Sequence, residues 1–148
     1  MALKDFHGQS AQNFVDYWFD VATKTLDRFW FFQLDVHGGK FSQISKVSNK
    51  DTAYAHRDKL YLVQFYDRYL NNETFPASSL PFLDGWVDAT VEPLSQSEWG
   101  AYANYADPRL ENADELYYGV NLPRLQKLKA KYDPKQLFYY PQGVQPKA

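Results

Sequence analysis

The spacing of apolar side chains near the start of the chain predicts a helix followed by a strand. Apolar residues first recur at three- and four-residue intervals, at Phe14, Tyr17, Trp18 and Val21. Ser10 precedes them and is a preferred N-cap residue, so a helix is expected over residues 11–26. The aromatic run at 29–36 is rich in strand-forming residues and too short to favour a helix, so we expect a strand there.

The rest of the chain mixes short extended and helical segments without a regular alternation. In order, we expect a turn at 37–39, a returning strand at 40–47, a strand at 60–66, a loop at 71–84, a short helix at 86–91 and an extended segment at 99–105. Asn121 is expected to cap a last helix, which Asp133 and Pro134 end. This order predicts one α+β domain over residues 1–148, with an antiparallel β-sheet and helices packed mainly on one face.

The strand at 29–36 carries two different faces, because side chains alternate along a strand. One face is apolar (Trp30, Phe32, Leu34 and Val36), and the other holds Phe31, Gln33 and Asp35. The first face is expected to join the core. An amide and a carboxylate beside an aromatic ring suit a ligand-facing surface, but the pattern alone favours a half-exposed strand whose polar face is covered by water. Gln64 interrupts the apolar strand at 60–66 in a similar way.

Composition and charge limit the classes of protein. Aromatic residues make up 18% of the sequence, so they fill a core or line a pocket. The net charge of −2 without a basic run argues against a nucleic-acid partner, and no apolar stretch is long enough to predict a membrane span. The chain has no Cys and no histidines at metal-ligand spacing, so no metal site is expected. Its first residues lack the apolar run of a signal peptide, which leaves the localisation open, and Asn72-Glu73-Thr74 is a glycosylation sequon that matters only in a secreted protein.

Small residues alternate with large, polar-tipped ones between Trp99 and Tyr105. The small residues would let a flat ring approach the backbone, and Tyr102 and Asn104 would offer hydrogen bonds to its polar edge. A packed strand with tyrosine hydroxyls at the surface would give the same pattern. A free tyrosine has a pKa of about 10, so a tyrosine here acts as a base only in a strongly perturbed site.

Six blocks of sequence carry a resemblance to a known family. They are Trp30 to Gly39, Thr52 to Arg57, Tyr102 to Asp107, Tyr117 to Leu125, Lys131 to Pro134, and Phe138 to Gln142. In this order the chain resembles the C-terminal, substrate-facing region of fungal FAD-linked oxidases of the berberine bridge enzyme and oligosaccharide oxidase family. The resemblance implies that residues 1–110 belong to a substrate domain. It also implies that 111–148 form a helical segment that returns to a flavin-binding domain.

The resemblance implies an FAD-dependent oxidase of alcohol, sugar or secondary-metabolite hydroxyl groups, which passes hydride to the flavin and reduces O2 to H2O2. At the matching positions, Tyr105 is the catalytic base and Asp35 is its supporting carboxylate. A tyrosine hydrogen-bonded to a carboxylate can pass on its proton. The other implied site residues are Phe31, Gln33 and Gln64 in the substrate groove, and Tyr102 and Asn104 against the flavin ring.

Two departures from the family pattern define the alternatives. Family members bind the pyrophosphate and adenine of FAD in an N-terminal domain, and many attach the flavin through His and Cys, whereas this sequence contains no Cys. Phe31 stands where the family pattern has Trp, which bears on sugar stacking. Three hypotheses follow: the substrate module of an oxidase, completed by a flavin-binding domain or by self-association; a stand-alone, cofactor-free acid–base enzyme; and a vestigial binding protein.

Overall fold

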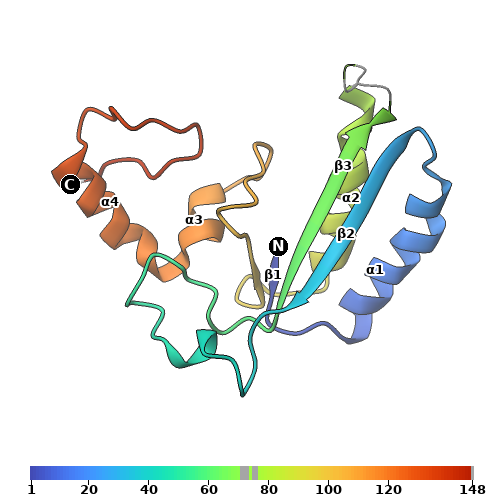
Figure 1. The fold of residues 1–148 in the computed structure, drawn as a ribbon, viewed down its shortest axis with the longest axis horizontal. Helices are drawn as coiled ribbons and strands as arrows, with labels where there is room; N and C mark the ends of the chain where they lie inside the picture. Colours follow the sequence, from blue (N-terminus) through green and yellow to red (C-terminus); the bar gives the residue numbers. More distant parts are fainter. Residues whose placement is uncertain (71–73, 75–76, 148) are drawn as a thin grey trace.

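The chain forms one antiparallel sheet with helices beside it (Figure 1). The computed structural model describes residues 1–70, 74 and 77–147, so most of the sequon at Asn72 lies outside the described residues. The strands are β1 (Ala2–Leu3), β2 (Arg28–Val36), β3 (Tyr61–Tyr69) and β4 (Trp99–Gly100). The α-helices are α1 (Gly8–Asp20), α2 (Pro81–Val91), α3 (Ala113–Tyr118) and α4 (Leu122–Tyr132).

The sheet has the strand order β2-β3-β1-β4, and its largest part is the long hairpin of β2 and β3 at one side. These two strands pair along their full length, from Arg28 opposite Tyr69 to Val36 opposite Tyr61. β1 is much shorter and pairs with β3 only at Leu62 and Tyr61. Most of the second edge of β3 therefore has no neighbouring strand among the described residues.

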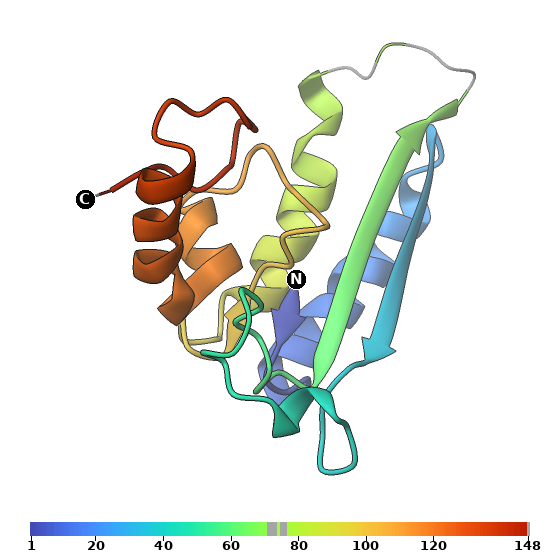
Figure 2. The ribbon, with the colours of Figure 1, turned by 60° about the vertical axis from the view of Figure 1, so that its left-hand side comes forward.

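Helices α1 and α2 cover one face of the hairpin, as Figures 1 and 2 show from two directions. Trp86 of α2 lies at the centre with 0% of its surface exposed, and its indole nitrogen donates to the Phe14 carbonyl at 3.2 Å. Phe14 of α1 meets the Phe32 ring edge to face at 5.0 Å, and Trp30 contacts Trp86 at 5.5 Å. Trp30 and Phe32 of the predicted apolar face thus join the core, whereas Leu34 and Val36 of the same face are 40% and 75% exposed. The predicted α+β class with helices mainly on one face is confirmed.

Several predicted element boundaries are wrong. The first helix begins at Gly8 and ends at Asp20, so Ser10 lies inside it and is no cap. Its buried hydroxyl instead donates to the Thr90 carbonyl at 2.8 Å and ties α1 to α2. The loop expected up to residue 84 ends earlier, because α2 begins at Pro81, whose fixed φ and missing N–H suit the first turn of a helix.

The predicted returning strand at 40–47 is also wrong, because β3 is the partner of β2. Backbone N–H groups of His37 and Gly38 both donate to the Leu60 carbonyl, at 2.8 and 2.9 Å, and close the hairpin there. Residues 39–58 form an excursion between these points, with a short 3₁₀ turn at Ile44–Lys46. Its serines bond to nearby backbone groups, as Ser42 does with the His37 carbonyl, and this competes with strand pairing.

The segment at 99–105 is extended only at Trp99–Gly100, and a turn follows in which the Tyr105 N–H donates to the Tyr102 carbonyl at 2.8 Å. The last helix, α4, is confirmed and ends before Asp133. Asn121 precedes it without capping it, since its buried amide donates to backbone carbonyls of the excursion, including Asn49 at 2.7 Å. The turn and this anchor hold the helical arm against the excursion.

Helices α3 and α4 form an arm beside the sheet (Figures 1 and 2). An apolar cluster at its base contains Ala101, Leu116 and Tyr117, and so includes residues on both sides of the predicted boundary at 110. The division at that boundary stays a prediction. α4 has no buried residue, and Leu128 and Tyr132 of its apolar stripe are 39% and 72% exposed.

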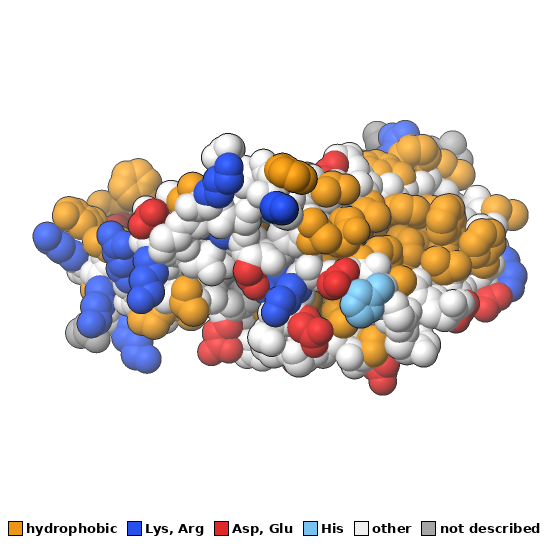
Figure 3. All heavy atoms as spheres, turned by 90° about the horizontal axis from the view of Figure 1, so that it is seen from below, with side chains coloured by type: hydrophobic (Ala, Val, Ile, Leu, Met, Phe, Trp, Pro, Cys, Tyr) orange, Lys and Arg blue, Asp and Glu red, His pale blue; other side chains and the backbone are white. Residues whose placement is uncertain are grey.

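The space-filling view from below shows a broad hydrophobic patch on the half of the molecule that holds α1 and β2 (Figure 3). Trp18 stacks on the exposed Phe19 at 5.3 Å and meets Phe32 at 4.9 Å, and Leu34 and Val36 are exposed further along the same face of β2. Among the described residues, no helix is long and apolar enough to cross a membrane, and no group of three or more His, Cys, Asp or Glu could hold a metal.

Candidate functional site

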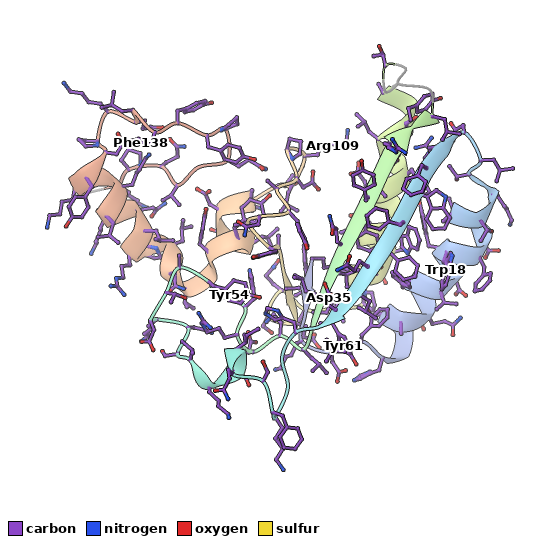
Figure 4. All side chains as sticks on the ribbon, viewed as in Figure 1. Trp18, Asp35, Tyr54, Tyr61, Arg109 and Phe138 are labelled. Carbon is purple, nitrogen blue, oxygen red and sulfur yellow. The ribbon has the colours of Figure 1, made fainter. Side chains whose placement is uncertain are left out.

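The face of the hairpin turned away from α1 and α2 carries the polar side chains that the strand pattern singled out. Gln33 and Gln64 lie directly opposite each other in the register of β2 and β3. The amide of Gln33 donates to both carboxylate oxygens of Asp35, at 3.1 and 3.0 Å. Phe31 stacks on Tyr66 of β3 with ring centres 5.0 Å apart. In Figure 4, Asp35 lies on the side that faces Tyr54, and Trp18 lies on the opposite side.

A cavity of about 480 Å³ lies along the open edge of β3. Gln64 lines it from the sheet, and Asn104 and Tyr105 line it from the turn that follows β4. The ion pair between Arg109 and Asp84 joins the two sides of this cavity. The structure therefore brings Gln64 and Tyr105 to one space, although they come from distant parts of the sequence.

A second cavity, of about 530 Å³, opens between the arm and the excursion at 39–58. Its walls are mostly aromatic and polar and include Tyr102, Asn104, Tyr117 and Tyr118. The Asn104 amide donates to the Tyr102 hydroxyl at 2.8 Å, and Asn104 lines both cavities. Tyr102 and Asn104 thus stand where the two cavities meet.

A pair that sequence reasoning missed lines the second cavity. The Tyr54 hydroxyl lies 2.5 Å from Nε2 of His37. Burial lowers the pKa of His37, and the Arg57 cation lowers it further, while burial raises the pKa of Tyr54 to about 12, with Tyr102 adding to the effect. Both groups are therefore neutral near pH 7, so Tyr54 donates to Nε2 and the histidine proton is on Nδ1. No spacing signal could have joined two residues that are 17 positions apart.

Tyr105 and Asp35 are not joined by a hydrogen bond in the described part of the chain, where the Asp35 carboxylate accepts from Gln33 instead. Tyr105 meets Tyr102 edge to face at 5.1 Å, and Tyr102 meets Tyr54 in the same way at 5.8 Å. The tyrosines form a row along the two cavities. The pairing of Tyr105 with Asp35, and the roles of all seven predicted site residues, stay predictions.

The second cavity suits a flat ring with a polar edge. Tyrosine rings supply flat apolar surfaces, and the amide of Asn104 supplies polar atoms. Nε of Arg57, which lines this cavity, is buried and has no hydrogen-bond partner among the described residues. A buried donor without a partner costs free energy, and an acceptor on a bound ring would satisfy it. The residues present thus fit the ring of a flavin.

Comparison with known proteins places the chain among characterised relatives. The family model described as "Berberine and berberine like" matches residues 101–145. A carbohydrate oxidase of Microdochium nivale is 61% identical over 148 residues, which is 99% of this chain and 30% of the relative. A glucooligosaccharide oxidase of Sarocladium strictum is 45% identical, over 93% of this chain and 29% of the relative. The chain thus spans about 30% of the length of these curated relatives.

Solved structures show the same relationship. The carbohydrate oxidase of Microdochium nivale, in complex with a substrate analogue, superposes with a TM-score of 0.94 and 60% identity, over 99% of this chain and 32% of that chain. A xylooligosaccharide oxidase of Myceliophthora thermophila, in complex with xylobiose, gives a TM-score of 0.91 and 38% identity, with the same coverage. A relative from Metarhizium anisopliae, 40% identical over 90% of this chain and 26% of the relative, is an FAD-linked oxidoreductase, which supports FAD as the cofactor by resemblance. The resemblance seen in the sequence is confirmed: residues 101–145 match the berberine and berberine-like family, and nearly the whole chain is similar to one part of fungal carbohydrate oxidases and of an FAD-linked oxidoreductase.

Proposed function

We propose that this chain supplies the substrate-binding surface and the catalytic base of an FAD-dependent oxidase that acts on carbohydrate hydroxyl groups. The observation that carries the proposal is that Gln64 and Tyr105 line one cavity. The relatives support the substrate class, since two are a glucooligosaccharide and a xylooligosaccharide oxidase. Because the chain spans about 30% of the Microdochium nivale relative, the activity is proposed for the complete protein.

Tyr105 is the proposed base that takes the proton of the substrate hydroxyl. A free phenol has a pKa of about 10, so this role needs an acceptor that favours the loss of its proton. The family pattern assigns this task to Asp35, which lies beside Gln33 on the polar face of the hairpin. Its present partner is the Gln33 amide, which can turn to a substrate hydroxyl and leave the carboxylate to Tyr105.

The other site residues bind and orient the reactants. Gln33 and Gln64 lie opposite each other, and their amides can donate to and accept from sugar hydroxyls. Phe31 offers an apolar ring on the same face for the ring of a sugar. Tyr102 and Asn104 would hold the flavin ring at the second cavity. The flavin, when bound, supplies the oxidant that accepts a hydride and passes the electrons to O2.

The proposal also assigns a partner to the helical arm. Leu137, Phe138 and Tyr139 are 82%, 84% and 69% exposed, and Leu128 and Tyr132 of α4 are 39% and 72% exposed. Contiguous apolar surface of this kind marks an interaction site. We assign it to the flavin-binding domain of the complete protein, as the family resemblance implies for residues 111–148.

A chimeric oxidase tests the proposed function. This chain would replace the matching region of the Microdochium nivale carbohydrate oxidase, which supplies the flavin-binding part. The chimera should show a visible flavin spectrum and release H2O2 from oligosaccharides. Tyr105→Phe should keep the spectrum and cut turnover by ~100- to 10,000-fold, the range for loss of a general base. The control Tyr17→Phe, on the helix side of the sheet, should leave turnover unchanged.

Two outcomes would contradict the proposal. A Tyr105→Phe chimera with full turnover would exclude Tyr105 as the base. A chimera that binds FAD but produces no H2O2 from any of a panel of oligosaccharides would exclude the carbohydrate substrate class.

A further inference from the structure

Among the residues that the structure describes, one edge of β3 lacks a neighbouring strand over most of its length. Beyond the short β1, Met1 is the one described residue whose backbone bonds to this edge, by exchanging two hydrogen bonds of 2.9 and 2.8 Å with Val63. From Gln64 to Arg68, no described backbone group bonds to this edge. Peptide groups alternate in direction along a strand, so the N–H and C=O groups of Phe65 and Asp67 point to the open edge, as those of Val63 do.

The open edge forms the floor of the first cavity, and both cavity walls carry apolar side chains besides the Arg109–Asp84 ion pair. Leu80, Leu83 and Val87 line one wall from α2 or just before it. Pro108 and Leu110 line the other wall, from the segment that follows β4. A floor of unpaired peptide groups between apolar walls has the shape and chemistry that receive an extended strand.

Asp67 adds a second observation on the same floor. Its side chain is 2% exposed, and Oδ2 accepts a hydrogen bond from Arg28 at 3.1 Å. The other oxygen, Oδ1, is buried and has no hydrogen-bond partner among the described residues. Burial raises the pKa of Asp67 above its ordinary value, despite Arg28. A buried acceptor without a partner costs free energy. A hydrogen-bond donor on a segment bound in the groove would therefore stabilise the Asp67 carboxylate and the bound segment together.

We propose that an extended segment of the longer polypeptide lies antiparallel against this edge of β3, in line with β1, and continues the sheet. The Microdochium nivale relative has about 70% of its length outside the matched region, which covers 30% of it, so such a segment is available. The register of β1 fixes the pairing. Because Ala2 lies opposite Leu62, the second and fourth residues before Met1 would lie opposite Phe65 and Asp67.

The register also predicts the chemistry of the segment. Residues opposite each other in an antiparallel pair point to the same face of the sheet. The residue opposite Phe65 would therefore enter the groove against Leu83 and should be apolar. The residue opposite Asp67 should carry a hydrogen-bond donor. The residue opposite Gln64 would point to the polar face and form a wall of the cavity that Tyr105 lines.

Hydrogen exchange tests the proposal without any assay of activity. The probe is this chain extended before Met1 by the segment of about ten residues that precedes the matching region in the Microdochium nivale oxidase, long enough at ~3.4 Å per residue to pass Asp67. In the extended chain, the Phe65 and Asp67 amides should exchange at least ~10-fold more slowly than in the unextended chain. Gln64 and Tyr66 amides, which point to β2, should be protected in both and report that the hairpin is folded.

A matched control carries the same extension with proline at the second and fourth residues before Met1, which removes the donors opposite Phe65 and Asp67. This control should lose the added protection. Equal exchange of these two amides with and without the extension, while Gln64 stays protected, would overturn the proposal. A second result would also overturn it: slow exchange of the Phe65 and Asp67 amides in the unextended chain that increases with protein concentration, together with self-association in sedimentation. A second copy of the chain would then occupy the edge.

Discussion

Replacing Arg28 by methionine should destabilise the fold by ~3–5 kcal/mol at neutral pH, because it removes the counter-ion of a buried carboxylate. The Arg28 and Asp67 side chains are 7% and 2% exposed, and their closest atoms are 3.1 Å apart. Methionine keeps an unbranched apolar stem beside the Phe82 ring, over which the guanidinium now lies at 5.0 Å. The variant therefore tests the charge rather than the packing.

Two further effects set the size of the change. Arg28 also donates to the Ser79 carbonyl and hydroxyl, each at 3.1 Å, and each lost bond adds ~1 kcal/mol. Protonation of Asp67 limits the loss, because burial already raises the pKa of this carboxyl above 3.8 and loss of Arg28 raises it further. A raised pKa means that the ionised form disfavours the folded state. The stability lost in Arg28→Met should therefore be largest above the pKa that Asp67 has in the folded state. It should shrink as the pH falls towards 3.8.

Urea denaturation, followed by tryptophan fluorescence at pH 7 and at pH 4.5, measures this effect. The double variant Arg28→Met with Asp67→Leu should recover most of the lost stability, since an apolar pair often replaces a buried ion pair without cost. Lys24→Met, which breaks a surface pair with Asp20, should change little. A single variant as stable as the parent chain, or a double variant less stable than Arg28→Met, would refute the reasoning.

Three other substitutions or conditions have clear expected outcomes. Trp86→Ala should lower the free energy of unfolding, measured by calorimetry, by ~3–5 kcal/mol, because Trp86 is 0% exposed; a decrease of less than a third of this would show that Trp86 is not central to the core. Burial lowers the pKa of both His37 and His56, so the unfolded chain binds their protons more readily and stability should fall as the pH drops below about 6.5. Replacing both by glutamine should flatten that slope in denaturation at pH 5–7. Gly38→Ala should lower stability by ~1–3 kcal/mol, because its Cβ would overlap the Lys59 carbonyl oxygen; an unchanged melting temperature would contradict this close approach.

The strand faces and the fold class could be predicted because they follow from local alternation. Trp30 and Phe32 point to the helices, and Gln33 and Asp35 point away, as a period of two requires. The partner of that strand could not be predicted in the same way. The hydrogen bonds from His37 and Gly38 to Leu60 join residues more than twenty positions apart, and local pattern favoured the nearer segment.

The candidate site shows the same division between local pattern and distant contact. Alternation marked Gln33 and Asp35, but the role of Tyr105 came from the family resemblance, because a tyrosine in a turn has no pattern of its own. The contact of Tyr54 with His37 depends on how the excursion at 39–58 folds back, and neither residue stood out from its neighbours. Tertiary packing, rather than propensity, decides such contacts.

The closure of the hairpin at Gly38 and Leu60 separates the segment that lines the second cavity from the strands that form the sheet. The excursion between them carries Tyr54 and Arg57 to the second cavity, while β2 and β3 pair without any contribution from it. Lengthening a loop costs only ~0.6 kcal/mol for each doubling, so the excursion can change in length or sequence while the sheet register stays the same. An engineer could therefore exchange residues 39–58 as a cassette between relatives and reshape one cavity while the β2–β3 scaffold stays fixed.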